Sequence, residues 1–506
     1  MNSPSALRGA PPAPTADPRR WLMLAVTLVA MFMGVFDFYV VNIATPSLQS
    51  QLHAGQATLE LVIGGYTFTY ASLLVTGGRL GDVFSYRRMF IFGMSLFTVA
   101  SLLCGLAQTG DQLVGARLLQ GLGAALMVPQ VVALITVTFP PTERPRALSW
   151  FGVTLGLALV SGQILGGLLL TADAFDIGWR VIFLVNLPVG LVTVALASRL
   201  LPRVRGARRP RQDLVGTAGL AISLGLAILP LILGRTEGWP AWTWIMLGLS
   251  VPAMAATVLY ERALPARGGE PLIDLTLFRT RSFTVGLLTM TGIMTFYSGF
   301  IFGMTLFLQA GLHLDPLEAG LTFGPLGIGF ASSSLMARRL TTKYGSKVIS
   351  AGQAMLVLGT LALLLELRLD GVDTSAVRMI APLIFAGLGT GLTIPSLTGV
   401  VVSQVMPRQA GVASGLLATA QQFANTIGVA VFGVVFFDAL GPTPSRGDFV
   451  SSLEWVAGVG MGLSLVTLVL SFLLPRDRQQ QAGPQAAPAG PRQSSPAAEP
   501  SSAGRS

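Results

Sequence analysis

The sequence predicts an all-α polytopic membrane protein with fourteen transmembrane helices, arranged as two six-helix halves plus two inserted helices. Two observations predict this fold. Apolar segments long enough to cross about 30 Å of hydrocarbon, roughly 20 residues each, recur along the chain. In addition, only 11% of the 506 residues are charged and 52% are hydrophobic, whereas about 25% of the residues of a soluble globular protein are charged.

The apolar segments begin at Trp21 and end at Pro475. The first follows Arg19 and Arg20 as a signal peptide would, but it is too long and lacks a small-residue cleavage site. We therefore predict that it is the first transmembrane helix. The predicted spans are residues 21–44, 57–77, 89–107, 113–139, 147–171, 181–201, 214–234, 239–260, 282–310, 319–336, 348–366, 377–399, 411–437 and 450–475.

The basic residues predict how these spans are oriented. If the N-terminus is inside, 27 of the 33 lysines and arginines lie in inner connections or tails. Arg117 lies in the interior of a span, and five lie outside; Arg199 and Arg378, at the ends of their spans, are counted as inside and outside. Basic residues are enriched in cytoplasmic loops, so we expect a multi-pass protein of the cytoplasmic membrane with both termini cytoplasmic. The outer five are Arg180, Arg235, Arg368, Arg378 and Arg446.

The net charge of +10 follows from this orientation. It does not indicate nucleic-acid binding, because no basic stripe belongs to a soluble domain. The single cysteine, Cys104, predicts no disulfide, and His53 and His313 lie in separate outer connections, so no metal site is expected. We predict no cofactor and a monomer in contact with the lipid bilayer.

An internal repeat divides the chain. Short inner loops after the second and tenth spans, residues 78–88 and 339–347, each contain Arg-Leu with a basic residue eight positions after the arginine. Two such loops in corresponding places indicate two repeated halves, the usual design of secondary transporters. The predicted parts are a disordered tail (1–20), the first half (21–201), a linker with two inserted helices (202–281), the second half (282–475) and a disordered tail (476–506).

Four stretches resemble the major facilitator superfamily in its fourteen-span drug:proton antiporter branch. Residues 37–46 join an aspartate to Val-Val-Asn and a final Pro, and residues 78–88 are similar to the signature inner loop of the superfamily. Residues 117–123 resemble the proton-coupling motif and residues 162–167 the antiporter motif of exporters. The resemblance implies a proton-coupled exporter of small amphipathic organic compounds. It implies proton coupling by Asp37 and Arg117, a signature loop with Gly78, Asp82, Arg87 and Arg88, and an antiporter motif with Gly162, Gln163, Gly166 and Gly167.

The chain departs from the family pattern at several positions. In the signature loop, Val83, Ser85 and Tyr86 stand where the family has Arg, Gly and Arg. Gln163 replaces the proline of the antiporter motif, and Gly64 replaces an acid that multidrug members often carry in the second span. The resemblance implies a relay of charges in the inner loop and a bend in the fifth span. The departures fall on the residues that would form these two features.

Asp37 is the residue whose chemistry is most constrained by its position. A charged side chain near the centre of an apolar span costs at least about 2.5–3.5 kcal/mol, so it is expected to face a cavity or a partner. Counted from the span ends, Asp37 and Arg117 lie at similar depths, about 10 Å and about 9 Å. We expected them to be the only acid and the only base inside the spans. Their proximity favours a protonation switch, and the alternative is a fixed structural ion pair.

Polar and aromatic residues within the spans could contact a substrate. For each of them alone, an interhelical hydrogen bond or ordinary packing is the more frequent role. The predicted pocket residues are Phe38, Asn42, Tyr66, Gln120, Gln421 and Asn425.

Other functions are excluded or left as alternatives. No lysine follows a glycine as the phosphate loop of an ATP-driven pump requires, and no filter-like loop or charged ring indicates a channel. We predict that the chain is not an enzyme. A proton-linked importer of a small organic solute and a non-transporting membrane sensor remain alternatives.

Overall fold

The structure is a computed structural model that describes residues 17–140, 142–172, 176–204, 213–269, 271, 275–403, 410–441 and 443–474. Within these ranges every regular element is a helix, so the predicted all-α class is confirmed. Residues 1–16 and 475–506 lie outside the described residues, and the disorder of the tails therefore stays a prediction.

The helices follow the predicted order. The first eight are α1 (Arg20–Ile43), α2 (Thr45–Leu52), α3 (Gln56–Phe84), α4 (Tyr86–Leu106), α5 (Gly110–Thr138), α6 (Arg144–Ala172), α7 (Val181–Leu184) and α8 (Asn186–Leu200). The next two are α9 (Leu214–Thr236) and α10 (Ala241–Ala263). The rest are α11 (Arg281–Leu306), α12 (Pro316–Thr322), α13 (Gly324–Tyr344), α14 (Lys347–Asp370), α15 (Ile380–Ser403), α16 (Ala410–Leu440) and α17 (Arg446–Phe472).

The predicted number of fourteen spans is not confirmed. In the described residues, 12 helices are long and apolar enough to cross a membrane, and a thirteenth is obtained if the two parts of α6, bent by 41°, count as one span. The remaining predicted span, 319–336, is divided between α12 and α13. Its helix α13 is present, but its glycines, serines and two arginines, Arg338 and Arg339, make it less apolar than the others.

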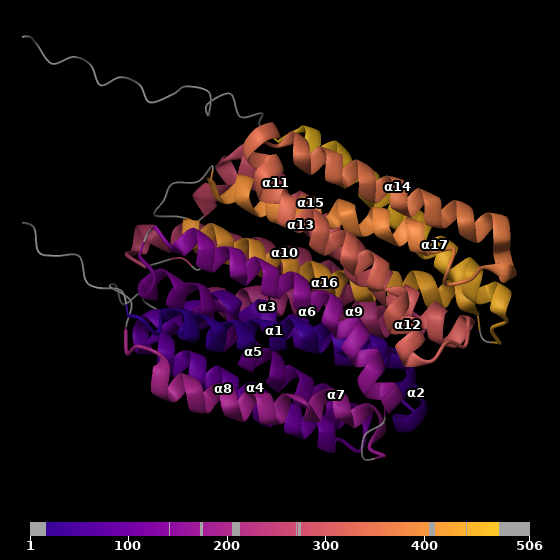
Figure 1. The fold of residues 1–506 in the computed structure, drawn as a ribbon, viewed down its shortest axis with the longest axis horizontal. Helices are drawn as coiled ribbons and strands as arrows, with labels where there is room; N and C mark the ends of the chain where they lie inside the picture. The colour runs from indigo at the N-terminus through magenta and orange to yellow at the C-terminus, as the bar shows by residue number, and fades with distance from the viewer. Residues whose placement is uncertain are drawn as a thin grey trace, which may run out of the picture.

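The two sets of six long helices pack in the same pattern. In the first set α1 packs on α6, α3 and α4 pack on α5, and α4 packs on α8. In the second set α11 packs on α16, α13 and α14 pack on α15, and α14 packs on α17. Figure 1 shows the first set at the bottom and the second at the top of the bundle. This recurrence agrees with the internal repeat, and we refer to the two sets as the halves. The exact domain boundaries stay a prediction.

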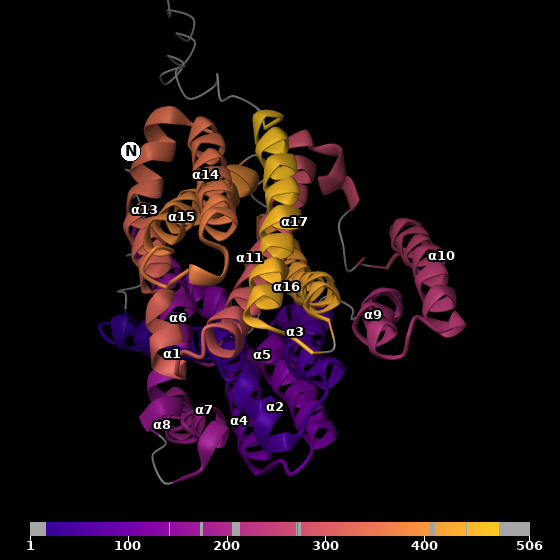
Figure 2. The same cartoon turned by 90° about the vertical axis from the view of Figure 1, so that its right-hand side faces the viewer.

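The inserted helices lie at the side of the bundle. Helix α9 packs against α10 and also against one helix of each half, α3 and α16. Figure 2 shows α10 on the outside of this pair, away from both halves. Only 6% of the apolar window of α10 is buried, as expected for a helix that faces lipid.

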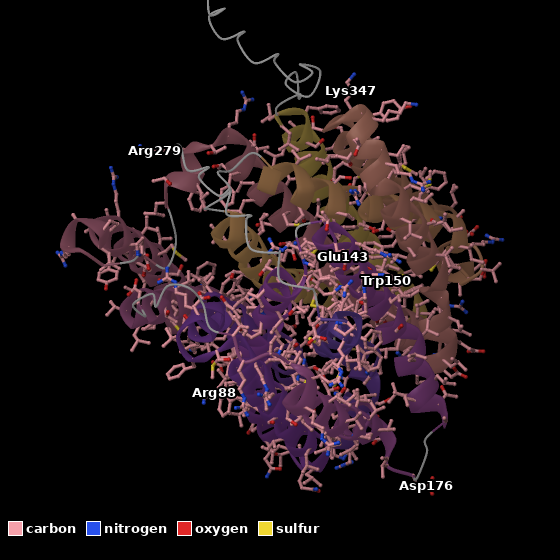
Figure 3. All side chains as sticks on the ribbon, turned by 60° about the vertical axis from the view of Figure 1, so that its left-hand side comes forward. Arg88, Glu143, Trp150, Asp176, Arg279 and Lys347 are labelled. Carbon is pink, nitrogen blue, oxygen red and sulfur yellow. The ribbon has the colours of Figure 1, made fainter. Side chains whose placement is uncertain are left out.

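The basic connections lie together at one end of the bundle. Figure 3, turned so that this end comes forward, labels Arg88, Arg279 and Lys347 there. We call this the basic end, and the opposite end, which carries α2 and α12, the α2 end. At the basic end Arg20 binds both carboxylate oxygens of Glu143, at 2.7 and 2.9 Å. This hydrogen bonding lowers the pKa of Glu143 and ties the start of α1 to the α5–α6 connection.

Candidate proton-coupling site

A buried ion pair joins α1 to α5. Arg117 Nη1 donates a hydrogen bond to Asp37 Oδ2, and both side chains are fully shielded from solvent. Burying two opposite charges together avoids the large cost of burying either alone, provided that their remaining polar atoms find partners. The neighbouring helices supply most of these partners.

Neutral polar groups surround the carboxylate. Gln120 Nε2 donates to Asp37 Oδ1 at 2.7 Å, and Asn186 Nδ2 of α8 donates to the same oxygen at 3.2 Å. Both amides also reach the hydroxyl of Ser101 in α4, at 2.8 and 3.4 Å. Four helices therefore hold Asp37 in one orientation. We call Asp37, Arg117, Gln120, Asn186 and Ser101 the Asp37 cluster.

The guanidinium of Arg117 is held on its other sides as well. Its Nε donates to the carbonyl of Val62 in α3 at 2.9 Å, and Nη1 also donates to Gln120 Oε1 at 2.7 Å. The ring of Tyr66 lies 4.4 Å from the guanidinium carbon, a cation–π distance. Its Nη2 finds no hydrogen-bond partner among the described residues. One donor of this buried cation is thus left available for another acceptor.

This arrangement allows a specific chemical change. A proton on Asp37 removes the counter-charge of Arg117, which then remains as an uncompensated cation away from water. Such a charge is costly, so protonation favours a conformation in which Arg117 finds water or another anion. Asp37 and Arg117 can therefore convert proton binding into movement of α1, α3 and α5.

The signature loop is helical for most of its length. We expected a loop over residues 78–88, but α3 continues to Phe84, and only Ser85, at φ 130°, separates it from α4. The Tyr86 hydroxyl donates to Asp82 Oδ1 at 2.7 Å, so the tyrosine that replaces the family arginine supplies a hydrogen bond instead of a charge. Arg87 donates to the Ser198 carbonyl at the end of α8.

The other two predicted signature residues, Gly78 and Arg88, make no side-chain hydrogen bond among the described residues. A Cβ on Gly78 would contact Pro129 of α5 at 3.6 Å, an ordinary packing distance. Arg88 is exposed at the basic end. Tyr86 and Arg87 thus bind within the first half, whereas Arg79 donates to the Pro271 carbonyl in the linker. The role of this motif in transport stays a prediction.

The antiporter glycines allow α6 to approach two different neighbours. A Cβ on Gly166 would lie 2.7 Å from both Val40 and Ile43 of α1, and Gly162 faces Tyr39 of the same helix. Gly167 instead lies against the backbone of Pro316 in α12, which belongs to the other half. The seam between the halves therefore involves Gly167 directly, whereas Gly162 and Gly166 set the α1–α6 distance behind it.

Gln163 does not prevent the bend of α6. The two parts of the helix, Arg146–Ala158 and Ser161–Ala172, meet at 41° without the family proline. Serine and glycine flank the bend, and such residues commonly accompany helix kinks. Gln163 Nε2 donates to the Tyr39 carbonyl at 3.4 Å, and thereby holds the bent part of α6 on α1.

Replacing Gly166 by leucine is expected to abolish export. The new side chain would enter the space occupied by Val40 and Ile43, and overpacking of this kind costs about 1–3 kcal/mol. Gly152 is the matched control, since a Cβ there meets nothing within 4 Å. Efflux and membrane content of both variants would be measured; efflux by Gly166→Leu equal to that of Gly152→Leu would contradict this packing.

The predicted pocket residues are divided between the two halves, and the pocket that they would form stays a prediction. Tyr66 and Gln120 belong to the surroundings of Asp37 and Arg117. Asn42 Nδ2 donates to the Phe38 carbonyl of its own helix at 2.9 Å. The remaining two, Gln421 and Asn425, lie in α16 of the other half.

Sequence reasoning also missed two residues. Ser101 bridges both amides of the Asp37 cluster, but a lone serine in an apolar helix gives no signal. Glu60, near the start of the predicted span 57–77, is buried in α3 and packs against Gly433 of α16. Our expectation that Asp37 is the only acid inside the spans is therefore wrong. The signal was available, because residue 60 falls within the predicted span 57–77.

Comparison with known proteins decides the family. The model of the Major Facilitator Superfamily matches residues 27–429. The chain belongs to this superfamily. It is a multi-pass membrane transporter of that family, and the predicted resemblance is confirmed.

Several characterised or named relatives are similar over most of this major facilitator chain. It is 38% identical over 434 residues to a probable actinorhodin transporter of Streptomyces coelicolor, covering 86% of this chain and 75% of that protein. It is 32% identical to a tetracenomycin C resistance and export protein of Streptomyces glaucescens, covering 85% and 78%. It is 33% identical to a cephamycin export protein of Amycolatopsis lactamdurans, covering 90% and 92%.

A solved structure shows the same fold. A bacterial homologue of the human lysosomal transporter Spinster, in an inward-facing conformation, aligns with a TM-score of 0.65 over 91% of this chain and 97% of that chain. At 16% identity this similarity concerns the fold alone. The predicted fold class is confirmed by it.

Proposed function

We propose that the protein exports a small amphipathic organic compound across the cytoplasmic membrane in exchange for protons. The substrate would be a drug, an antibiotic or a metabolite of the producing cell. The observation that carries this proposal is the buried Asp37–Arg117 pair within its cage of neutral donors. The names of the relatives, which include export and resistance proteins, support the outward direction over import.

In the proposed cycle Asp37 binds and releases the transported proton. The ionised carboxylate pairs with Arg117 in the conformation described above. Proton arrival from outside breaks this pair, Arg117 seeks another partner, and the helices of the first half move. Return of the ion pair on the inner side releases the proton. Arg117 thus resets Asp37, and Gln120 and Asn186 keep the carboxylate in place.

The experiment that tests export uses a susceptible host without its own efflux pumps. Cells producing the protein are loaded with candidate antibiotics, and intracellular accumulation is followed over time. We expect at least one compound to be kept at a lower level, and we expect a protonophore to abolish the difference. Lower accumulation that survives the protonophore would contradict proton coupling, and faster uptake would favour an importer.

We further propose that the basic end is cytoplasmic and that the protein works as a monomer. Lys347 is exposed at the basic end, and Asp373 is exposed in the connection between α14 and α15 at the opposite end. Cys104 is the only native cysteine and is buried. It therefore does not interfere with labelling at the surface.

Cysteine labelling is expected to distinguish the two ends. In intact cells an impermeant thiol reagent should label Asp373→Cys and spare Lys347→Cys, because the positive-inside bias places the basic end in the cytoplasm. Lysed cells serve as the control in which both positions react. Labelling of Lys347→Cys alone in intact cells would invert the proposed topology.

A further inference from the structure

One pair of hydroxyl groups connects the two halves near the middle of α3. Thr67 of α3 and Thr426 of α16 are buried, and their oxygens lie 2.5 Å apart. Two further hydrogen bonds between described residues of the two halves each involve a backbone group and lie toward the α2 end. The threonine contact thus joins the two halves through side chains alone.

These two hydroxyls have more acceptors than protons. Thr67 Oγ1 lies 3.0 Å from the Gly64 carbonyl, and Thr426 Oγ1 lies 3.1 Å from the Gln422 carbonyl, each in its own helix. Each hydroxyl has one proton, so two protons are available for three contacts: one between the hydroxyls and one from each hydroxyl to its own helix. At any moment one hydroxyl donates across the halves and the other donates within its helix.

The contact can therefore open without leaving a polar atom unsatisfied. When α3 and α16 separate, both hydroxyls donate to their own helix carbonyls, a bond that threonine commonly makes inside helices. Buried polar groups without partners are costly, and here that cost does not arise. The pair consequently has two arrangements, closed and open, of similar stability.

Apolar side chains keep this contact dry. Phe68 and Ile427 follow the two threonines in sequence and pack with Ile228 of α9 and Phe423 of α16. The inserted helix thus covers the contact from the side. In such surroundings a hydrogen bond is electrostatically stronger than in water, so making or breaking it affects the position of α16 on α3.

The contact is also joined to the Asp37 cluster. Thr67 directly follows Tyr66, whose ring lies against Arg117 and whose hydroxyl donates to the Gly34 carbonyl of α1 at 2.8 Å. A movement of Arg117 changes the packing of Tyr66, and with it the backbone that carries Thr67. The groups around Asp37 are the titratable Arg117 (α5), with Tyr66 (α3) on Arg117 and Cys104 (α4) on Gln120, and the neutral Gln120 (α5), Ser101 (α4) and Asn186 (α8).

We propose that Thr67 and Thr426 form a latch between the halves that is closed while Asp37 is ionised and opens when Asp37 is protonated. The two threonines are positioning residues: they hold the halves and touch neither proton nor substrate. This inference rests on the proposed proton-coupled transport and adds the link between the proton site and the seam.

The chain contains a matched control pair. Thr76 of α3 and Thr217 of α9 are also buried, and their hydroxyl oxygens lie 2.8 Å apart. This contact has the same chemistry and shares helix α3, but it joins α3 to the inserted helix instead of the other half. If α9 moves together with α3, fixing this pair leaves transport intact.

The first test locks each pair covalently. In a Cys104→Ser background, Thr67→Cys/Thr426→Cys and Thr76→Cys/Thr217→Cys are oxidised in proteoliposomes, and proton-driven export is measured before and after reduction. We expect the disulfide of the first pair to abolish export and reduction to restore it, while the control disulfide has no effect. If the first pair exports equally fast with its disulfide formed and with its disulfide reduced, the latch is overturned. The proposed function then still stands, because the same vesicles show proton-driven export.

The second test asks whether the latch opens in response to protonation of Asp37. The rate of disulfide formation is measured against pH for both pairs, and the control pair corrects for thiol ionisation. We expect the corrected rate of the first pair to fall as pH falls, and to lose this dependence in Asp37→Asn. If the corrected rate of the first pair depends on pH in the same way with Asp37 and with Asp37→Asn, the proposed link between Asp37 and the latch is refuted.

Discussion

Asp37→Asn is expected to lose uphill export while the protein remains in the membrane. Asparagine retains the oxygen that accepts from Gln120 and Asn186, but it can neither release a proton nor balance the charge of Arg117. The variant therefore imitates the protonated state permanently. Everted vesicles with an imposed pH gradient should show no substrate accumulation, whereas exchange of labelled for unlabelled substrate without net proton movement should persist.

Asp373→Asn is a suitable comparison for this experiment. Asp373 is an acid of the same kind that is exposed in the connection between α14 and α15, away from the Asp37 cluster. We expect that variant to retain uphill accumulation. Accumulation by Asp37→Asn at the wild-type rate would place the proton site elsewhere, for instance at the buried Glu60.

Arg117→Met is expected to lower both stability and export. It leaves Asp37 buried without its counter-charge, and removing one partner of a buried ion pair typically costs about 3–5 kcal/mol. An isolated buried carboxyl group takes up a proton instead of remaining charged, so the variant should also fail to release protons. Thermal stability in detergent and uphill export measure the two effects separately.

The double variant Asp37→Asn/Arg117→Met separates structure from function. Replacing both charges of a buried pair by neutral groups of similar size is often nearly neutral for stability. We expect the double variant to regain thermal stability relative to Arg117→Met and still to lack uphill export. If it regains both, the pair is a structural ion pair, the alternative that the sequence left open.

The sequence allowed the fold and the main pair to be predicted for clear physical reasons. Apolar length and the distribution of arginine depend on the bilayer, not on packing, so they can be recognised without a structure. The proximity of Asp37 and Arg117 was predicted from their similar depth and opposite charge. The span 319–336 is not confirmed as a span, because glycine, serine and arginine make its helix α13 less apolar than the other long helices.

Contacts between side chains of ordinary type could not be predicted. Ser101 and the two threonines of the latch are small polar residues of a kind that occurs throughout the spans, and only their three-dimensional neighbours distinguish them. The antiporter glycines were recognised as a motif, but the helices that they pack against were not. Three of them face two different helices, α1 and α12, because successive residues of α6 point in different directions.

The most direct measurement of the central claim is proton movement during transport. Purified protein in proteoliposomes containing a pH-sensitive dye is given a substrate gradient, and the internal pH is recorded for wild type and for the Asp37→Asn/Arg117→Met variant. We predict that substrate movement drives protons the opposite way in the wild type and moves none in the double variant. Proton movement at the wild-type rate in the double variant would contradict the assignment of coupling to Asp37.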